Sequence, residues 1–311
     1  IWTAACDLWQ VSEAASGILI HGHSADLYTV CWHPAKPHVF ASASEGSRVF
    51  LWDSGERRLL NACSVGFQCR SVAISPVEMA VFPGSSERSH HVAVGGKMGR
   101  LYVMDEATFQ PLFRDKRCVS AIDELKYSPN GKVLAAASHD TVIDLYRVTS
   151  VKREGPYVHT HRLVGHSATV THVDFSLDST VLQSCGMDYE LLHWDVGTGK
   201  QVTQNQRNTP WATLTCTLGF SVMGIWAEGA DGTDVNALDR TADGTLCATA
   251  DDYGLVKLFN WPCVVEGAGH KQYVGHSSFV LCVRFSPDEQ RLVTAGGRDR
   301  SIMQYRLVRL E

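Results

Sequence analysis

The chain alternates between short apolar runs and short clusters of turn residues. The clearest stretch lies near the C-terminus, where VLCVRF (280–285), RLVTA (291–295) and SIMQYRL (301–307) are separated by Ser-Pro-Asp and Gly-Gly-Arg-Asp. Runs of this length, rich in β-branched and aromatic residues and bounded by turn residues, predict strands joined by tight connections. The pattern recurs more weakly at 72–76 and 125–131, and it predicts an all-β fold.

The same layout repeats along the chain. A Gly-His pair precedes an apolar run, and an aromatic residue follows the histidine after 28 or 29 residues. The three His–aromatic pairs are His23 and Trp52, His166 and Trp194, and His276 and Tyr305. Spacings this similar predict a structural repeat rather than a single irregular domain.

An aromatic or apolar residue ending the third strand of each unit can be marked from one end of the chain to the other. These seven landmarks are Trp9, Trp52, Met104, Tyr146, Trp194, Phe259 and Tyr305. The repeat resembles the WD40 repeat, which implies a WD40 β-propeller with seven blades, one of them incomplete or atypical. The blades would form a single domain over 1–311. The longest interval, between Trp194 and Phe259, predicts an insertion at about 207–240.

WD40 repeats carry a buried polar chain in which an Asp bonds the Gly-His histidine, the histidine bonds a hydroxyl, and the hydroxyl bonds the Trp ring N–H. Such a chain is stable when every member is paired. Three Asp residues lie six positions before a landmark aromatic, namely Asp140, Asp188 and Asp299. The resemblance implies that the unit with His166, Ser184, Asp188 and Trp194 is complete. In the last unit we expect His276 and Asp299 to pair, with Ala295 at the hydroxyl position, and His23 fills the histidine position of the first unit.

The first residues are interpreted as the end of a blade. Residues 1–11 read as a third strand that ends near Trp9, and 17–20 read as the outer strand that follows it. The first two strands of that blade would then lie upstream, which predicts a fragment of a longer protein. The alternative is a six-blade ring closed by an N-terminal strand.

Composition narrows the function classes. The net charge is −5 and the pI about 6.3, a balance that does not favour nucleic-acid binding through phosphates. No apolar stretch of the sequence has the length of a membrane span, so we expect no membrane partner. The ten cysteines are scattered without a Cys-x-x-Cys pair and predict buried free thiols in a reducing cytoplasm.

Candidate chemistry is weak throughout. His21-Gly22-His23 and His159-Thr160-His161 lack a third ligand, so no metal site is expected. The glycine-rich 95–99 is followed by a strand pattern rather than a helix, which excludes a phosphate loop. Ser, His and Asp occur without a Gly-x-Ser-x-Gly elbow. We therefore expect no catalytic residues, no cofactor and no enzymatic activity.

The insertion contains the most distinctive sequence segments of the chain, WATLTCTLGF at 211–220 and GIWAEGADGTDVNA at 224–237. These segments are similar to the sequences of the EMAP-like (echinoderm microtubule-associated protein-like) family, specifically to the second of its two tandem propellers. The resemblance implies an upstream propeller in the full-length protein, a location at the cytoskeleton in the cytoplasm, and tubulin or microtubule-associated partners. The alternative function is a generic WD40 adaptor in another multiprotein complex.

Partner contact is expected on the insertion. Trp226 is an aromatic flanked by the acids Glu228 and Asp231, and aromatics of this kind anchor interfaces. The competing interpretation is that the aromatics of the insertion pack it onto its own blade.

Overall fold

The computed structural model describes residues 8–11, 16–20, 22–82, 84–150, 155–227, 229–230 and 232–308, with side chains from residue 22 onward. These residues form antiparallel strands and two short 3-10 helices, and no helix among them is long and apolar enough to cross a membrane. The chain divides into two compact units, residues 1–69 with 224–311 and residues 70–223. The prediction of an all-β fold is confirmed.

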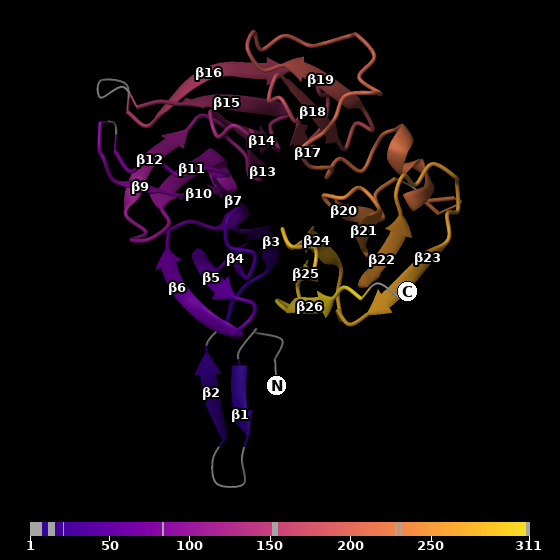
Figure 1. Ribbon diagram of the computed structural model, residues 1–311, viewed down its shortest axis with the longest axis horizontal. Helices are drawn as coiled ribbons and strands as arrows, with labels where there is room; N and C mark the ends of the chain where they lie inside the picture. Colours follow the sequence, from indigo (N-terminus) through magenta and orange to yellow (C-terminus); the bar gives the residue numbers. More distant parts are fainter. Residues whose placement is uncertain are drawn as a thin grey trace. The chain divides into compact units, whose positions relative to one another are not determined.

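The first unit contains three sheets whose strands follow one another in sequence order (Figure 1). Two sheets have four strands and one has three. Their strands are β3 (Leu27–Trp32), β4 (Val39–Ser44), β5 (Arg48–Asp53) and β6 (Arg58–Ser64); β20 (Val235–Arg240), β21 (Leu246–Asp251), β22 (Leu255–Asn260) and β23 (His270–Val274); and β24 (Val280–Phe285), β25 (Arg291–Gly296) and β26 (Ile302–Arg306). A separate hairpin joins β1 (Leu8–Val11) to β2 (Ser16–Ile20).

The second unit also contains three main sheets. Their strands are β7 (Cys69–Ile74), β10 (His91–Gly96), β11 (Arg100–Asp105) and β12 (Pro111–Lys116); β13 (Ile122–Tyr127), β14 (Val133–Ser138), β15 (Val142–Val148) and β16 (Tyr157–Val164); and β17 (Val170–Phe175), β18 (Val181–Gly186) and β19 (Leu191–Asp195). A two-residue ladder, β8 (Met79–Ala80) with β9 (Arg88–Ser89), occupies the connection before β10, and the 3-10 helices are η1 (Lys97–Gly99) and η2 (Phe220–Ile225).

These sheets are the blades that the repeat predicts. Six of the seven landmark residues lie in the third strand of a blade, and the seventh, Trp9, lies in β1 of the separate hairpin. Among the described residues, six blades of three or four strands plus a two-stranded hairpin agree with the expected propeller that has one incomplete blade. The strands predicted at 280–285, 291–295 and 301–307 correspond to β24, β25 and β26 within one or two residues.

Within each unit, neighbouring blades pack their apolar faces against one another. In the second unit, Leu145 and Leu163 of one blade meet Val173 and Phe175 of its neighbour in one buried cluster. In the first unit, Leu27 and other residues of the β3–β6 blade share a buried cluster with residues of the β24–β26 blade. The indole N–H of Trp32 also donates to the carbonyl of Arg284 at 3.1 Å. The first complete blade of the chain therefore packs directly on the last.

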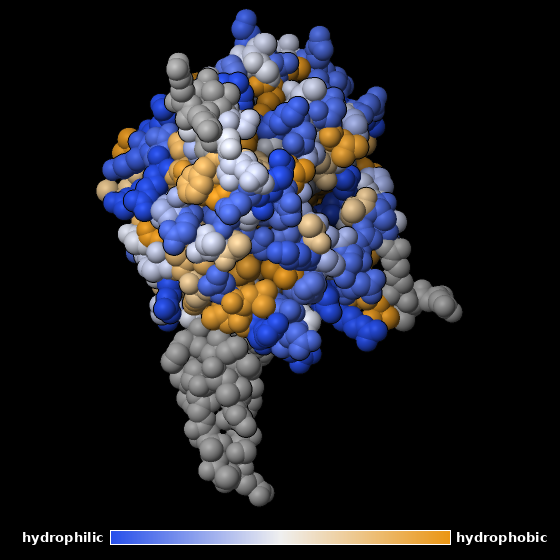
Figure 2. All heavy atoms as spheres, turned by 60° about the vertical axis from the view of Figure 1, so that its left-hand side comes forward, coloured by the Kyte–Doolittle hydropathy of each residue, from blue (hydrophilic) through white to orange (hydrophobic). Residues whose placement is uncertain are grey.

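On the face drawn in Figure 2, hydrophilic side chains dominate and hydrophobic ones form small groups. Scattered exposed apolar residues of this kind need no special explanation.

Candidate functional site

The structure brings together the four polar residues of the blade β17–β19. The His166 Nδ1 atom lies 2.8 Å from the carboxylate of Asp188, and His166 Nε2 lies 2.8 Å from the hydroxyl of Ser184. The indole N–H of Trp194 donates to the same hydroxyl at 2.8 Å. Because a carboxylate only accepts, Nδ1 carries the proton, and the serine hydroxyl then donates to Nε2. We call this chain from Trp through Ser and His to Asp the relay.

The pKa of Asp188 reflects this arrangement. Burial alone would raise it, but the bonds from His166 and from the backbone N–H groups of Ser167 and Glu190 together lower it below its ordinary value. The glycine of the Gly-His pair has a steric role, because a Cβ at Gly165 would lie 2.7 Å from the Trp194 ring. The pair therefore lets the indole approach the backbone while the histidine reaches the aspartate.

The blade β24–β26 contains a related relay. His276 Nδ1 lies 2.8 Å from Asp299 and 2.9 Å from the Ser301 hydroxyl, and His276 Nε2 lies 2.7 Å from the hydroxyl of Thr294. No indole is present, since Tyr305 fills the landmark position and donates its hydroxyl to the sulfur of Met303 at 3.6 Å.

The expectation that Ala295 occupies the hydroxyl position of this blade was wrong. The position belongs to Thr294, eleven residues before the landmark instead of ten. The reason is an extra residue in the turn before the third strand. The N–H of Gly297 donates to the backbone carbonyl three residues after the histidine of its blade, and the N–H of Met187 does the same in the complete blade. Gly297 is nevertheless one residue farther than Met187 from the landmark aromatic of its own blade.

The first blade has three members of the relay. His23 Nε2 lies 2.7 Å from the hydroxyl of Ser42, and the Trp52 indole donates to that hydroxyl at 2.7 Å. Gly46 stands where the aspartate would be, six residues before Trp52. Among the described residues, His23 Nδ1 is buried without a hydrogen-bond partner. Burial, with a smaller contribution from Arg48, lowers the pKa of His23 to about 3.

This histidine predicts an acid sensitivity. The unfolded chain takes up a proton near pH 6.5 whereas folded His23 does not until about pH 3, so stability is lost as pH falls through this window. Gly46→Asp should supply the missing acceptor and flatten that part of the pH profile. Urea unfolding of both proteins between pH 7 and pH 4 measures the difference. Parallel pH profiles would contradict the role assigned to His23.

Asp140 has a different role from the other two aspartates. It accepts hydrogen bonds from the backbone N–H groups of Val119 and Ser120. Cys118 stands at the position that a histidine fills in the complete relay, and its thiol donates to Asp144 at 3.3 Å. Asp140 therefore caps a loop and does not take part in a His-containing relay.

In the structure, three residues of types that can bind metal ions lie close together: His166, Asp188 and Glu190. His166 and Asp188 are bonded to each other, so a cation there would have to displace the relay. His159, from the His-x-His pattern for which no metal site is expected, lies 2.7 Å from the buried carboxylate of Asp144. The nine cysteines in the described part of the chain are all free thiols.

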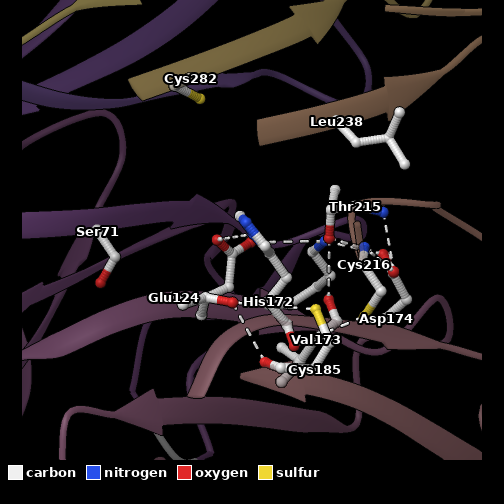
Figure 3. Close-up of polar contacts among 12 residues, drawn as sticks. Ser71, Glu124, His172, Val173, Asp174, Cys185, Thr215, Cys216, Leu238 and Cys282 are labelled. Carbon is white, nitrogen blue, oxygen red and sulfur yellow. Dashed lines mark hydrogen bonds and ion pairs between the residues drawn. The ribbon is translucent and has the colours of Figure 1, made fainter. Parts of the chain in front are cut away.

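The first half of the insertion has a buried anchor that the sequence pattern does not predict. Residues 210–212 lie beside residues 175–177 at the end of β17, where the N–H of Leu177 donates to the carbonyl of Pro210 and the N–H of Ala212 to that of Phe175. Beyond them, the carboxylate of Asp174, on β17, lies fully buried (Figure 3). It receives six polar contacts between 2.6 and 3.1 Å, from Thr213 Oγ1, Thr215 N, Thr215 Oγ1, Cys216 N, Gln183 Nε2 and Lys126 Nζ.

Electrostatics explain why this carboxylate stays ionised. Burial alone would raise the pKa of Asp174, but Lys126 and the donors of the insertion hold it well below its usual range. Lys126 lies on β13 of the neighbouring blade and also lies 3.5 Å from Glu124. We call this arrangement the Asp174 clamp. It fixes the insertion to two blades, and the only sequence signal for it was the Thr-rich text at 213–217.

The rest of the insertion belongs partly to each unit. In the second unit, Phe220 and Met223 of η2 are about half exposed, and the Arg207 guanidinium lies 4.1 Å above the Phe220 ring. In the first unit, the N–H of Gly224 donates to the carbonyl of Cys263 at 2.8 Å, and a Cβ at Gly224 would lie 2.2 Å from a backbone oxygen. Trp226 is half-buried, while Glu228 and Asp231 lie outside the described residues.

The blades and their relays define a β-propeller of the WD40 type. A model of the family described as "Echinoderm microtubule-associated protein second beta-propeller" matches residues 27–307, so the chain belongs to this family. It is 37% identical over 93% of its length to echinoderm microtubule-associated protein-like 2 of Rattus norvegicus, and likewise to the 77 kDa echinoderm microtubule-associated protein of Strongylocentrotus purpuratus. These matches cover 43% and 40% of the relatives, so the chain spans less than half of their length.

Proposed function

We propose that this propeller is a non-catalytic protein-interaction module of the cytoskeleton that acts in the cytoplasm and binds tubulin or microtubule-associated proteins. The observation that carries the proposal is membership of the family over residues 27–307, since the relatives are named as microtubule-associated proteins. The His and Asp residues of the relays support a scaffold, because they bond one another inside the blades. The presence of a further propeller upstream stays a prediction, which the residues preceding Ile1 would test.

The insertion is the proposed contact surface. Its first half is held by the Asp174 clamp and by backbone bonds to β17, so it is already ordered before a partner arrives. A preorganised surface binds more tightly because less conformational entropy is lost on association. We propose that Trp226 anchors the partner and that Glu228 and Asp231 supply charge at the rim.

The test reverses the two charges. Glu228→Lys with Asp231→Lys should reduce co-sedimentation with microtubules, or pull-down of tubulin, at least about tenfold, because like charges at an interface repel. A matched control reverses Glu56 and Glu87, two exposed acids in other loops, and shifts the net charge equally. The proposed contact surface is disproved if both double variants bind as the parent does, or if both lose binding alike.

A pull-down with the parent protein distinguishes the cytoskeletal module from the generic WD40 adaptor. A pull-down from cytoplasmic extract should recover tubulin or microtubule-associated proteins as the main bound fraction. Recovery of an unrelated complex, with no enrichment of microtubule proteins, would favour a generic WD40 adaptor.

A further inference from the structure

Two buried thiols meet beside the Asp174 clamp. Cys185 lies on β18, Cys216 lies in the insertion, and both residues are at most 1% exposed. Cys185 faces His172 of β17 across the ladder, and the Cys216 thiol donates to the backbone carbonyl of the same His172 at 3.6 Å. The Cys216 thiol also forms a hydrogen bond to the Cys185 sulfur (Figure 3). Two sulfur atoms from separate segments of the chain are therefore in contact.

The Cys185 sulfur is surrounded by donors. The Cys216 thiol and the backbone N–H of Thr217 donate to it, and the hydroxyl oxygen of Thr171 lies 3.9 Å from it. Thr171 comes this close because the register of β17 and β18 shifts between Val170 and His172, which makes Thr171 the extra residue of a bulge. A sulfur that accepts several hydrogen bonds is stabilised in its charged form.

The two thiols are shifted in opposite directions. The hydrogen bond from Cys216 and the nearby His172 hold the pKa of Cys185 below its ordinary value, although burial alone would raise it. Burial, the bond to Cys185 and the Asp174 carboxylate raise the pKa of Cys216 well above its ordinary value, and Lys126 opposes them. Cys185 is thus the sulfur that carries negative charge, and Cys216 is the one that keeps its proton.

We propose that Cys185 and Cys216 form a modification site at which hydrogen peroxide produces an intramolecular disulfide. The Cys185 thiolate attacks the peroxide, the O–O bond breaks, and a sulfenic acid and hydroxide form. The Cys216 sulfur then attacks the Cys185 sulfur, the S–O bond breaks, and the oxygen leaves as water with the Cys216 proton. The hydroxide takes the proton that Cys185 had released. The two sulfurs lose two electrons and peroxide gains them, so one disulfide and two water molecules result.

Access to the pair depends on local opening of the insertion. His172, whose carbonyl accepts from Cys216, has a side chain that is 11% exposed, so the pair lies directly under the surface. Residues 213–217 lie outside every strand and are held by the hydrogen bonds of the Asp174 clamp. Segments of this kind open at a lower free energy than core strands. Peroxide should therefore reach the thiols slowly, at a rate limited by this opening.

The disulfide would lock the insertion onto its blade. β18 is paired on both sides, with β17 and with β19, and is therefore a firm attachment. Once Cys216 is linked to it, residues 213–217 can no longer move away from the blade until the bond is reduced. This effect does not depend on which partner the insertion binds, so the inference stands apart from the proposed function.

Treatment of the full 311-residue chain with hydrogen peroxide tests the site. After alkylation of the remaining thiols, mass spectrometry of peptides should find Cys185 linked to Cys216 in most molecules. The amides of 212–217 should then exchange at least about tenfold more slowly than in the reduced protein. Cys247 and Cys263 are the internal control, because they are also buried and near each other, but both have a raised pKa and should remain thiols.

Two variants separate the roles of the sulfurs. Cys216→Ser removes the second thiol, so peroxide should leave a sulfenic acid on Cys185 that dimedone labels. Cys185→Ser should leave Cys216 a thiol under the same treatment, because Cys216 keeps its proton. Dimedone labelling of the two variants at the same rate would overturn the assignment of Cys185 as the attacking sulfur.

The parent protein alone can also overturn the site, even if neither variant folds. One such result is that Cys185 and Cys216 remain thiols under conditions in which the partly exposed Cys63 is oxidised. Another is that Cys247 and Cys263 link to the same extent, which would mean that any neighbouring pair reacts. A third is a link between Cys185 and Cys216 that leaves exchange in 212–217 unchanged, which would contradict the lock.

Discussion

Replacement of Asp174 by Ala is expected to lower the free energy of unfolding by about 3–5 kcal/mol, the cost typical of removing one partner of a buried ion pair. The substitution leaves the Lys126 ammonium, itself largely buried, without its fully buried carboxylate. It also removes the acceptor for Thr213, Thr215 and Cys216 of the insertion. Because a buried donor without an acceptor costs free energy, the insertion should detach along β17.

Urea unfolding measures the stability change, and hydrogen exchange of 210–216 measures the detachment. Asp178→Ala is a matched control in the same blade, since Asp178 is exposed and bonds only within its own turn. It should cost much less and leave exchange in 210–216 unchanged. Similar losses in the two variants would refute the clamp. Loss of partner binding in Asp174→Ala at a temperature where the blades remain folded would also support the proposed surface.

Replacement of Trp194 by Ala is expected to cost about 3–5 kcal/mol, the range found for removing a large aromatic side chain from a packed core. The Trp194 side chain is 2% exposed and lies in the cluster shared by two blades. Its loss would leave a cavity beside Gly165 and remove the donor to Ser184. Few single changes in the second unit should weaken it more.

Trp194→Phe separates packing from hydrogen bonding. Phe keeps much of the apolar volume but has no N–H, so the Ser184 hydroxyl loses its donor. We expect an intermediate cost, and Ser184→Ala added to Trp194→Phe should cost less than the two single changes summed, because they break the same chain. Thermal and urea unfolding of the four variants form the test. Strict additivity, or a Trp194→Phe variant as stable as the parent, would show that the relay contributes little.

The relays show which residue positions can be predicted from local sequence and which cannot. The positions of His166, Ser184, Asp188 and Trp194 could be read from spacing because all four lie within one repeat. The same reading placed the hydroxyl of the last blade at Ala295, because spacing cannot reveal an extra turn residue between two strands. The hydrogen bond between His276 Nε2 and the Thr294 hydroxyl, seen only in the folded structure, identified the position.

The sequence by itself determined the repeat, the strands and the family. These follow from local periodicity and from turn residues, which act over a few positions, and from text that relatives share. The tertiary structure decided the Asp174 clamp, because Lys126, Asp174 and Thr215 are 41 to 89 residues apart and meet only when two blades pack. Within the described residues it also left β26 paired with β25 alone, since the pairing of a strand depends on which distant segment lies beside it and not only on the strand's own residues.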